Sequence, residues 1–587
     1  MESSMERYIS TKYTSYSPQG KINRHLAILI LLIATLSACK NEISNINNPV
    51  IPGFNPDPSV CRVGEDYYLV TSTFEYFPGV PVYHSKDLVN WQMIGHVIHR
   101  PGQLDYSNIS STAGIYAPTI RYHRGIYYVI TTMVGGLRDS IVEQKGNFIM
   151  TAQNPAGPWS DPRWIDNAPG IDPSLFFDED NRVYYTGNRH EENSKFRAER
   201  DIWIQEIDLD NFELKGPVSV LDSRPYFESN IIGGAAAFEA PHLYKKDGTY
   251  YLLIAHGGTG MGHAASIWKS DSPLGPWEMN PGNPILTHRG YEQSGINCTG
   301  HADIFKTDDG EWWTVFLGVR SKDKKNNVMG RETFLSKVDW SGEWPVINPD
   351  GETGRTAHSI PAPEMRDGEQ RSFNFRDDFN DDQLQPDWTF IRNPKTTWWD
   401  QSTKAGYMQL KLRPEVIEDY SRPVFMGIRV IEMNCTFTTS MDFTPQKPGE
   451  CAGMAFLRGH KPHWSLVKEM HENQARASVY YADSLLSGTD LRGSGELGLK
   501  ITLDDFKLSF FIKEDAGDWQ KICETDGHEL GFPPAGRFTG SFCGLYATSR
   551  VDSKVNNVAG FDWYEMKKPA GSCSVASSPA GLEPATP

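Results

Sequence analysis

Cysteines are few in this chain, and the short motifs that mark several common enzyme sites are missing. Its 587 residues include 8 cysteines, and none has the CxxC or Cys/His spacing of a zinc site. A Gly-rich phosphate loop, an HExxH segment and a GxSxG element are all absent from the sequence. Because the cysteines after Cys39 are odd in number, they do not indicate a disulfide framework, although one or two bridges are compatible with them.

Basic residues are also scarce relative to acidic ones. There are 57 lysines and arginines against 74 aspartates and glutamates, which gives a formal net charge of −17. Nucleic-acid binding needs clustered Lys and Arg to contact phosphates, so we expect no nucleic-acid partner. The length of the chain exceeds what one hydrophobic core usually fills, and it predicts at least two domains.

A short apolar run lies near the N-terminus. Lys21 and Arg24 precede this run at residues 26–36, which is too short to span a bilayer and has the layout of a secretory signal. The segment Leu36-Ser-Ala-Cys39 resembles a bacterial lipoprotein box, so Cys39 is predicted to be the lipidated first residue of the mature protein. We expect an exported protein at the bacterial cell envelope that touches the membrane only through this anchor. A simple secreted protein, in which Cys39 has no such role, stays open.

A short repeat runs through the first two-thirds of the chain. In five copies a polar turn is followed 10 to 12 positions later by an aromatic pair, Tyr-Tyr or Trp-Trp. The copies begin at Asp57, Ala117, Asp172, Glu239 and His301. A repeat of roughly 60 residues, made of aromatic and β-branched runs between Gly and Asp turns, is typical of propeller blades. The repeat predicts an all-β fold with a five-bladed β-propeller.

Equivalent positions of the blades should converge, because the innermost strand of each blade lines the central channel. The leading residues would then bring the carboxylates of Asp57, Asp172 and Glu239 and the imidazole of His301 to one end of the axis. Each residue alone is weak evidence, since Asp before Pro usually forms a turn. Packing would favour similar neutral residues, whereas chemistry needs unlike titratable groups close together, so the set predicts an active site.

A second all-β region follows the repeats. Strands with alternating or aromatic-rich patterns are expected at 408–412, 477–481, 507–513 and 560–564, with turn signals between them. About a dozen such strands fit a two-sheet β-sandwich or jelly roll. The predicted organisation is a leader at 1–39, a tether at 40–48, the propeller at 49–360, a linker at 361–372, the sandwich at 373–566 and a disordered tail at 567–587.

Aromatic residues are abundant. They make up 12% of the chain and include 16 tryptophans. Aromatic faces stack on the C–H faces of sugars, which favours a carbohydrate ligand, although propellers also use aromatic residues in packing.

Five sequence motifs resemble one known family. They read Asn48-Pro-Val-Ile-Pro-Gly-Phe-Asn-Pro-Asp-Pro-Ser, Ser72-Thr-Phe-Glu-Tyr-Phe-Pro-Gly, Phe238-Glu-Ala-Pro-His, Gly300-His-Ala and Gly330-Arg-Glu-Thr. These motifs are similar to those of the β-xylosidases of glycoside hydrolase family 43. The resemblance covers nearly the whole mature chain, because that branch also carries a concanavalin-like sandwich after a five-bladed propeller.

The resemblance implies an inverting hydrolase with three carboxylates. Asp57 would be the general base that takes a proton from water, and Glu239 the general acid that protonates the leaving oxygen. Asp172 would orient Glu239 and raise its pKa. An inverting enzyme needs its base and acid roughly 6.5–9.5 Å apart, so that a water fits between base and sugar. We predict that the pKa of Glu239 is the most raised of the three, because Asp172 and apolar neighbours oppose its ionisation.

The same resemblance implies four substrate contacts. Phe74 matches an aromatic platform beneath the sugar. Arg331 matches an arginine that reaches the sugar hydroxyls, although a salt bridge to Glu332 or another surface acid would also explain it. His301 matches an axial histidine that in relatives helps to hold water or an ion, often calcium. The chemistry requires no cofactor, and a structural calcium near His301 stays open but is not predicted. Tyr116 stands where many relatives have Trp, which leaves the preference for xylose or arabinose open.

These residues predict an exo-acting hydrolase that releases terminal β-D-xylose from xylan-derived oligosaccharides. An α-L-arabinofuranosidase acting on arabinoxylan or arabinan is the nearest alternative. A surface glycan-binding lipoprotein without catalysis and a scaffold propeller for protein partners also stay open. We expect the sandwich to stabilise the propeller rather than to bind carbohydrate by itself.

Overall fold

The computed structural model describes most of the chain from Asn45 onward. The described residues are 45–107, 109–135, 145–191, 193–196, 198–229, 235–321, 327–364, 370–371, 373–493, 495–531, 538–550 and 556–568. They belong to one compact unit. The predicted leader with Cys39, most of the tether and nearly all of the tail lie outside these residues. Within them, we find no helical segment with the length and apolarity that crossing a membrane would require.

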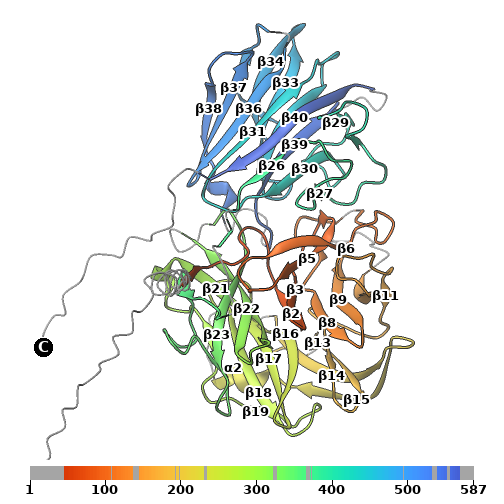
Figure 1. The fold of residues 1–587 in the computed structure, drawn as a ribbon, viewed down its shortest axis with the longest axis vertical. Coiled ribbons are helices and arrows are strands. Elements are labelled where there is room, and N and C mark those ends of the chain that lie inside the picture. The colour runs from red at the N-terminus through yellow and green to blue at the C-terminus, as the bar shows by residue number, and fades with distance from the viewer. Residues whose placement is uncertain are drawn as a thin grey trace, which may run out of the picture. The chain divides into compact units, whose positions relative to one another are not determined.

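Five antiparallel blades form the predicted β-propeller and follow one another in chain order from orange through yellow to green (Figure 1). The first contains β2 (Ser59–Val63), β3 (Asp66–Val70), β5 (Gly79–Ser85) and β6 (Gln92–Ile98). The second contains β8 (Thr119–His123), β9 (Ile126–Val134), β10 (Gly146–Ala152) and β11 (Arg163–Trp164), with β7 (Gly114–Ile115) added along β9. The third contains β12 (Ser174–Phe177), β13 (Val183–His190), β14 (Arg200–Asp208) and β15 (Glu213–Leu221).

The last two blades have the same plan. The fourth contains β16 (Ala235–Lys246), β17 (Thr249–Gly257), β18 (Ala264–Ser270), β19 (Glu278–Met279) and β20 (Leu286–Thr287). The fifth contains β21 (Ile296–Lys306), β22 (Trp312–Arg320), β23 (Glu332–Asp339) and β24 (Val346–Ile347). Helical turns are short: α2 (Arg224–Ser229) precedes β16, the 3₁₀ turn η1 (Glu292–Ser294) precedes β21, and a second one, η2 (His528–Leu530), lies in the sandwich.

The paired aromatics of the repeat pack between neighbouring blades. Tyr68 on β3 lies edge-on against Tyr127 of the second blade, with ring centroids 5.2 Å apart. Tyr67, on the same strand, lies edge-on against Phe305 of the fifth blade, with ring centroids 5.9 Å apart. Successive residues of a strand point to opposite faces of its sheet, so two adjacent aromatics can serve both neighbouring blades. This explains why the repeat contains a pair rather than a single ring.

The ring is closed by the first strand of the described chain. β1 (Asn45–Asn47) pairs antiparallel with β25 (Ser359–Pro361). The Asn48 side chain donates to the carbonyl of Leu335 over 2.9 Å and accepts from its N–H over 3.0 Å, which attaches the segment to the fifth blade. The last residues of the segment predicted as a tether at 40–48 therefore belong to the fold, because Ile46 is buried in the same apolar cluster as Ile360.

A buried polar network joins the inner strands at the propeller axis. The carboxylate of Asp303 on β21 accepts hydrogen bonds from Ser59 over 2.7 Å, Arg121 over 2.9 Å and Tyr244 over 2.8 Å. These three partners belong to the first, second and fourth blades. Burial opposes ionisation of Asp303, but the charge of Arg121 and the neighbouring His242 outweigh it and lower the pKa of this carboxyl.

Hydrogen bonds from threonine hydroxyls to proline carbonyls connect the third blade to the second and the fourth. Thr119 of the second blade donates its hydroxyl to the carbonyl of Pro173 over 3.0 Å. Thr186 of the third blade donates in turn to the carbonyl of Pro241 in the fourth blade over 3.1 Å. Because Pro173 directly follows Asp172, the bond from Thr119 to Pro173 anchors the chain beside one of the predicted site residues.

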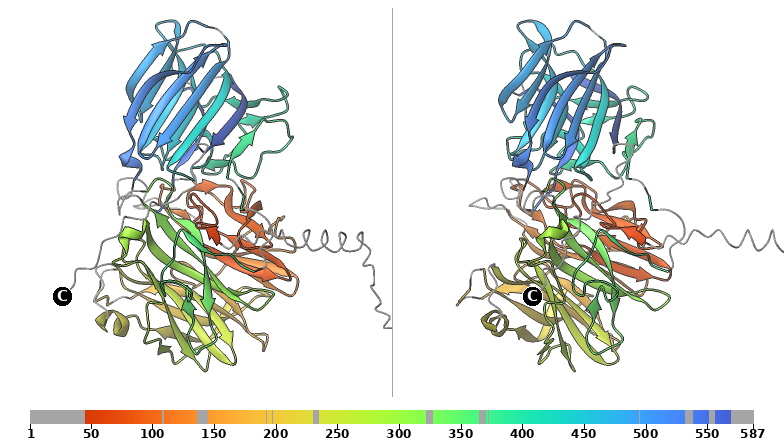
Figure 2. Two further views of the ribbon diagram at one scale, coloured as in Figure 1. Left: turned by 60° about the vertical axis from the view of Figure 1, so that its left-hand side comes forward. Right: turned by 90° about the vertical axis from the view of Figure 1, so that its left-hand side faces the viewer.

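The second domain is a β-sandwich of two sheets, drawn in cyan and blue (Figures 1 and 2). One sheet contains β35 (Ser484–Asp490), β34 (Gln474–Tyr481), β33 (His463–His471), β32 (Cys451–Leu457), β39 (Phe542–Thr548), β30 (Val424–Arg429) and β27 (Thr389–Ile391). The other contains β28 (Trp399–Asp400), β29 (Met408–Lys411), β40 (Val558–Lys567), β31 (Asn434–Asp442), β36 (Leu497–Asp504), β37 (Lys507–Glu514), β38 (Gln520–Asp526) and β26 (Phe375–Asp377). Buried and partly exposed residues alternate along β31 and β36, as expected for strands with one face on the core.

One strand of the propeller domain extends a sheet of the sandwich. β4 (Tyr76–Phe77), which follows β3, pairs antiparallel with β27, with Phe77 opposite Phe390 and Tyr76 opposite Ile391. The two domains therefore share an eight-stranded sheet. Since Phe74 lies two residues before β4, the sheet also fixes the segment that carries a predicted substrate contact.

Replacing Asp303 by Asn should strongly destabilise the propeller. The change leaves the buried guanidinium of Arg121 without its counter-ion, and breaking a buried pair in this way costs about 3–5 kcal/mol. Chemical denaturation followed by tryptophan fluorescence measures the loss. D308N is the matched control, because Asp308 forms an exposed ion pair with Arg62 and exposed pairs contribute at most about 1 kcal/mol. Equal losses in both variants would contradict the central role of Asp303.

Candidate active site

Four residues at the axis share an unusual backbone conformation. Asp57, Asp172, Ala240 and His301 have φ angles of 56°, 54°, 49° and 51°. Left-handed conformations are uncommon for residues with a side chain, and they cluster at functional sites. Each of the four stands two positions before the inner-strand residue of its blade, in the order Ser59, Ser174, His242 and Asp303. The backbone therefore defines the equivalent positions more clearly than the sequence repeat does.

Glu239 is not at the equivalent position, contrary to the prediction from the repeat. That position is held by Ala240, and Glu239 lies one residue earlier. Within β16, Glu239 pairs with Ala255, but the register shifts on both sides of it, before Glu239 and again before His242. Such bulges turn a side chain away from its regular direction. Glu239 joins the site through this irregularity, which the spacing of aromatic pairs does not reveal.

Asp57 is held by hydrogen-bond donors on both carboxylate oxygens. Ser72 donates its hydroxyl to one oxygen over 2.5 Å, and Arg331 donates Nη1 to the other over 2.6 Å. The imidazole Nδ1 of His301 lies 3.6 Å from that second oxygen. An ionised carboxylate can only accept hydrogen bonds, so this environment suits Asp57 as an anion.

Arg331 does not pair with Glu332, so that alternative from the sequence is wrong. The Glu332 carboxylate instead receives two hydrogen bonds from Arg320, each of 2.8 Å. Arg331 lies in the site, where it contacts Asp57 and donates Nη2 to the backbone carbonyl of Phe538 over 3.2 Å.

Asp172 and Glu239 lie close enough to affect each other's ionisation. Burial raises the pKa of Asp172 well above its ordinary value, and the charges of Glu239 and Asp57 add to this effect. Burial also raises the pKa of Glu239, and Asp57 adds to that increase. Arg200 and Arg331 act in the opposite sense on both carboxyls. Two carboxyls that interact in this way take up and release protons as a pair.

The pKa of Glu239 is raised, as predicted, and so is that of Asp172; that the increase is largest at Glu239 stays a prediction. Asp172 is buried, whereas Glu239 is only half-buried. The sequence supports a raised pKa at Glu239, but it does not reveal how deeply each carboxyl is enclosed.

An aromatic cluster lies beside Arg331. The ring of Phe74 is 4.8 Å from that of Tyr116 and 5.8 Å from that of Phe538, measured between centroids. The Arg331 guanidinium lies 5.5 Å from the Phe74 ring and 5.8 Å from the Phe538 ring. The hydroxyl of Tyr116 donates to the carbonyl of Thr112 over 2.6 Å, so it is already engaged. The structure therefore brings Phe74, Tyr116 and Arg331 together, as predicted.

The residue before His301 packs against a second buried histidine, His263. Burial lowers the pKa of His301, and the charge of Asp57 opposes this only in part, so the imidazole is neutral near pH 7. His263 lies beside Gly300, where an added Cβ would stand 2.8 Å from its ring. The Nδ1 atom of His263 lies 3.0 Å from the carbonyl of Cys298, which fixes the ring. A glycine is therefore required immediately before His301.

The residues near His301 do not match a calcium site. Across the described segments, no three or more His, Cys, Asp and Glu side chains are grouped so that they could hold a metal ion. Calcium takes six to eight oxygen ligands, whereas the nearest carboxylate, that of Asp57, is already bound by Ser72 and Arg331.

Two residues of the site carry no signal in the sequence. Phe538 belongs to the sandwich and reaches the propeller site only through the packing of the two domains. Arg200 begins β14 and lies outside every motif and repeat position, although its charge acts on both Asp172 and Glu239. Neither position could be recognised without the tertiary structure.

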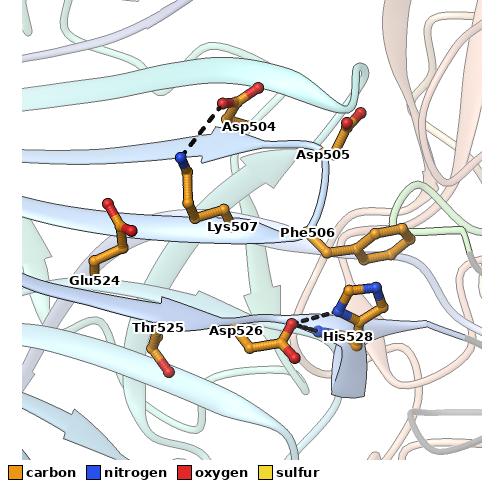
Figure 3. A pocket seen from close by; sticks show the side chains of 8 residues that line it. All are labelled: Asp504, Asp505, Phe506, Lys507, Glu524, Thr525, Asp526 and His528. Atoms are coloured by element: carbon orange, nitrogen blue, oxygen red, sulfur yellow. Dashed lines mark hydrogen bonds and ion pairs between the residues drawn. The ribbon is translucent and has the colours of Figure 1, made fainter.

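A hollow on the sandwich is separate from this site. It has a volume of about 790 Å³ and lies between the β36–β37 turn and the end of β38 (Figure 3). Lys507 faces Asp504 over 3.8 Å, and His528 contacts Asp526. None of the predicted site residues lines this hollow.

Comparison with known proteins assigns both domains. Residues 46–345 match glycosyl hydrolases family 43, and residues 376–567 match the β-xylosidase C-terminal concanavalin A-like domain. The chain is 37% identical over 525 residues to a xylosidase/arabinosidase of Butyrivibrio fibrisolvens, covering 87% of this chain and 97% of the relative. It is 38% identical over 552 residues to a non-reducing end α-L-arabinofuranosidase of Bacteroides ovatus, covering 93% and 98%.

A solved structure has the same architecture over most of this chain. The xylan β-1,4-xylosidase of Bacillus halodurans superposes with a TM-score of 0.80 at 31% identity, covering 89% of this chain and 100% of the other.

Phe538→Ala should impair glycoside hydrolysis although Phe538 belongs to the sandwich. The change removes one ring from the aromatic cluster and one face of the Arg331 contact, each worth about 1 kcal/mol, so kcat/KM should fall about thirtyfold. Aryl glycoside kinetics measure this. Phe511→Ala is the control, because Phe511 is a half-buried sandwich ring that contacts Lys500 rather than the site. If F538A kept wild-type kcat/KM, the sandwich would have no part in the site.

The repeat, the converging carboxylates and the two family matches agree with one another. The chain belongs to glycoside hydrolase family 43, as an enzyme with a five-bladed propeller and a C-terminal concanavalin-like sandwich.

Proposed function

We propose that the protein is an inverting exo-glycosidase that releases single pentoses, chiefly β-D-xylose, from the non-reducing ends of xylan-derived oligosaccharides. The observation that carries this proposal is the asymmetry of the three carboxyls. Asp57 is surrounded by donors, whereas burial and mutual repulsion raise the pKa values of Asp172 and Glu239. A base and an acid that differ in this way are what inverting hydrolysis requires.

Asp57 is the proposed general base. Its carboxylate accepts the proton of a water that attacks the anomeric carbon from the face opposite the leaving group. The bonds from Ser72 and Arg331 leave each oxygen a further lone pair for that water, while they hold the carboxylate in a fixed orientation.

Glu239 is the proposed general acid, and it shares a proton with Asp172. A carboxyl with a raised pKa remains protonated near neutral pH and can donate to the leaving oxygen. Glu239 is half-buried, whereas Asp172 is buried, so Glu239 is the member of the pair that a substrate can reach. Asp172 in its ionised form favours the proton on Glu239, because two like charges so close together are unfavourable.

The aromatic cluster supports action at chain ends. Phe74, Tyr116 and Phe538 lie together on one side of Arg331 and supply apolar faces for a single sugar ring. Because Phe538 comes from the second domain, the sandwich covers part of the propeller site. A covered site of this kind favours a terminal sugar over an internal one.

An α-L-arabinofuranosidase is the second candidate. The relative that supports it is the arabinofuranosidase of Bacteroides ovatus, 38% identical over 552 residues. Both pentoses present similar hydroxyls to the same carboxylates, so the catalytic residues would be unchanged. Tyr116 is the site residue at which the two preferences are expected to differ.

Asp57→Asn and Glu239→Gln should respond differently to the leaving group. We expect E239Q to reduce hydrolysis of xylobiose by about 10²–10⁴-fold, the contribution of a general acid, and to affect 2,4-dinitrophenyl β-xyloside much less, since that leaving group needs no proton. D57N should reduce both reactions, because every substrate needs the activated water. E213Q, at an exposed position on β15, is the control. Normal xylobiose turnover by E239Q would refute the assignment.

Product analysis decides linkage and stereochemistry. We expect proton NMR of a reaction with xylobiose to show α-xylose first, because a single displacement inverts the β-linkage. Parallel assays with 4-nitrophenyl β-xyloside and 4-nitrophenyl α-L-arabinofuranoside compare the two candidates, and we expect the higher kcat/KM on the xyloside. A clear preference for the arabinofuranoside would replace the first candidate by the second, and initial release of β-xylose would contradict inversion.

A further inference from the structure

Two neighbouring blades are joined by backbone pairing beside the acid. β14 of the third blade and β16 of the fourth pair in parallel through Arg200 and Ala237. This contact merges the two blades into one nine-stranded sheet. Ala237 stands two residues before Glu239, so the bridge fixes the main chain of Arg200 relative to the proposed general acid.

A buried asparagine connects the same arginine to Asp172. The Oδ1 atom of Asn188 accepts from Nη1 of Arg200 over 2.9 Å and from the backbone N–H of Ile171 over 3.1 Å. Ile171 directly precedes Asp172. The space around Asn188 is tight, because a Cβ added to Gly170 would stand 1.6 Å from the backbone carbonyl oxygen of Asn188. Asn188 therefore has little freedom to move.

Asn188 forms these bonds although its amide nitrogen has no partner. Its Nδ2 atom is buried without a hydrogen bond. A buried donor that makes no bond is unfavourable, so a purely structural role would favour a side chain without it. The unfavourable burial of this amide nitrogen is explained if the Oδ1 atom of Asn188 is needed to hold Arg200 and the backbone before Asp172 together.

The Arg200 guanidinium acts electrostatically on both members of the acid pair. Its charge acts against the burial of Asp172 and of Glu239, and lowers the pKa of each. Arg331 acts in the same sense on both groups, and Asp57 acts in the opposite sense. Asp172 also faces the phenols of Tyr116 and Tyr185, and Arg200 lies beside His190 on the neighbouring strand.

We propose that Arg200 is a positioning residue of the active site, which Asn188 and the β14–β16 bridge hold so that one negative charge stays on Asp172 and the reactive proton on Glu239. This inference rests on the proposed function. Without the cation, the pair would bind protons more tightly, and Asp172 would lose the charge that orients the acid.

The test compares Arg200→Gln and Arg200→Lys with the wild type. Glutamine can keep a hydrogen bond to Asn188 but removes the charge, whereas lysine keeps the charge without the fork of the guanidinium. For R200Q we expect the basic limb of the kcat/KM profile to move to higher pH by about one unit, because the acid loses its proton less readily. We also expect kcat to fall about tenfold or more from misplacement of the pair. R200K should keep the basic limb of the kcat/KM profile at the wild-type pH.

Arg182→Gln is the matched control. Arg182 lies in the same blade, where it forms an exposed ion pair with Asp180. R182Q should leave the pH profile and kcat unchanged. An unshifted basic limb in R200Q would overturn the proposal, even if its melting temperature fell, because a purely structural role changes stability without moving the limb. An equal shift in R182Q or R200K would overturn it as well.

Failure of this inference is distinguishable from failure of the proposed function. If E239Q hydrolyses xylobiose normally, the acid assignment itself is wrong. If E239Q behaves as expected and R200Q does not shift the limb, only the role of Arg200 is wrong. Should R200Q not fold, the proposal still requires that R200K keep the wild-type basic limb, and a limb moved upward by about one unit would overturn it.

Discussion

The carboxylate of Asp303 is the contact on which the arrangement of the propeller site depends. It binds Ser59, Arg121 and Tyr244, so a single buried anion joins the inner strands of four blades. A buried carboxylate is stable only when donors surround it, and here the donors can reach it only if the strands stand in one register. Asp57 and His301 lie two residues before Ser59 and Asp303. The network at the axis therefore fixes the main chain next to Asp57 and His301.

Charge divides the site into two halves. On one side Asp57, the proposed base, has Arg331 and Ser72 as partners, which suits an anion. On the other side Asp172 and Glu239 compete for a proton, and Arg200 limits how strongly they hold it. The same guanidinium of Arg331 also binds the carbonyl of Phe538, so the sandwich is joined directly to the base. This explains why the second domain cannot be regarded as a separate attachment.

The paired aromatics predicted the blades because adjacent residues of a strand face opposite sides, so that Tyr67 and Tyr68 contact the two neighbouring blades. The repeat also located Asp57, Asp172 and His301, which share one backbone conformation. It misplaced Glu239 by one residue, because the bulges of β16 shift the register on either side of that residue.

The sequence by itself determined the fold class, the number of blades, the sandwich and the three carboxyls, because alternation, turns and repeated spacing are local properties of the chain. Only the tertiary structure decided that Arg331 pairs with Asp57, that Phe538 enters the propeller site and that the charge of Arg200 acts on Asp172 and Glu239. These contacts join residues far apart in the chain. They arise from how blades and sheets pack together, and local sequence contains no record of that packing.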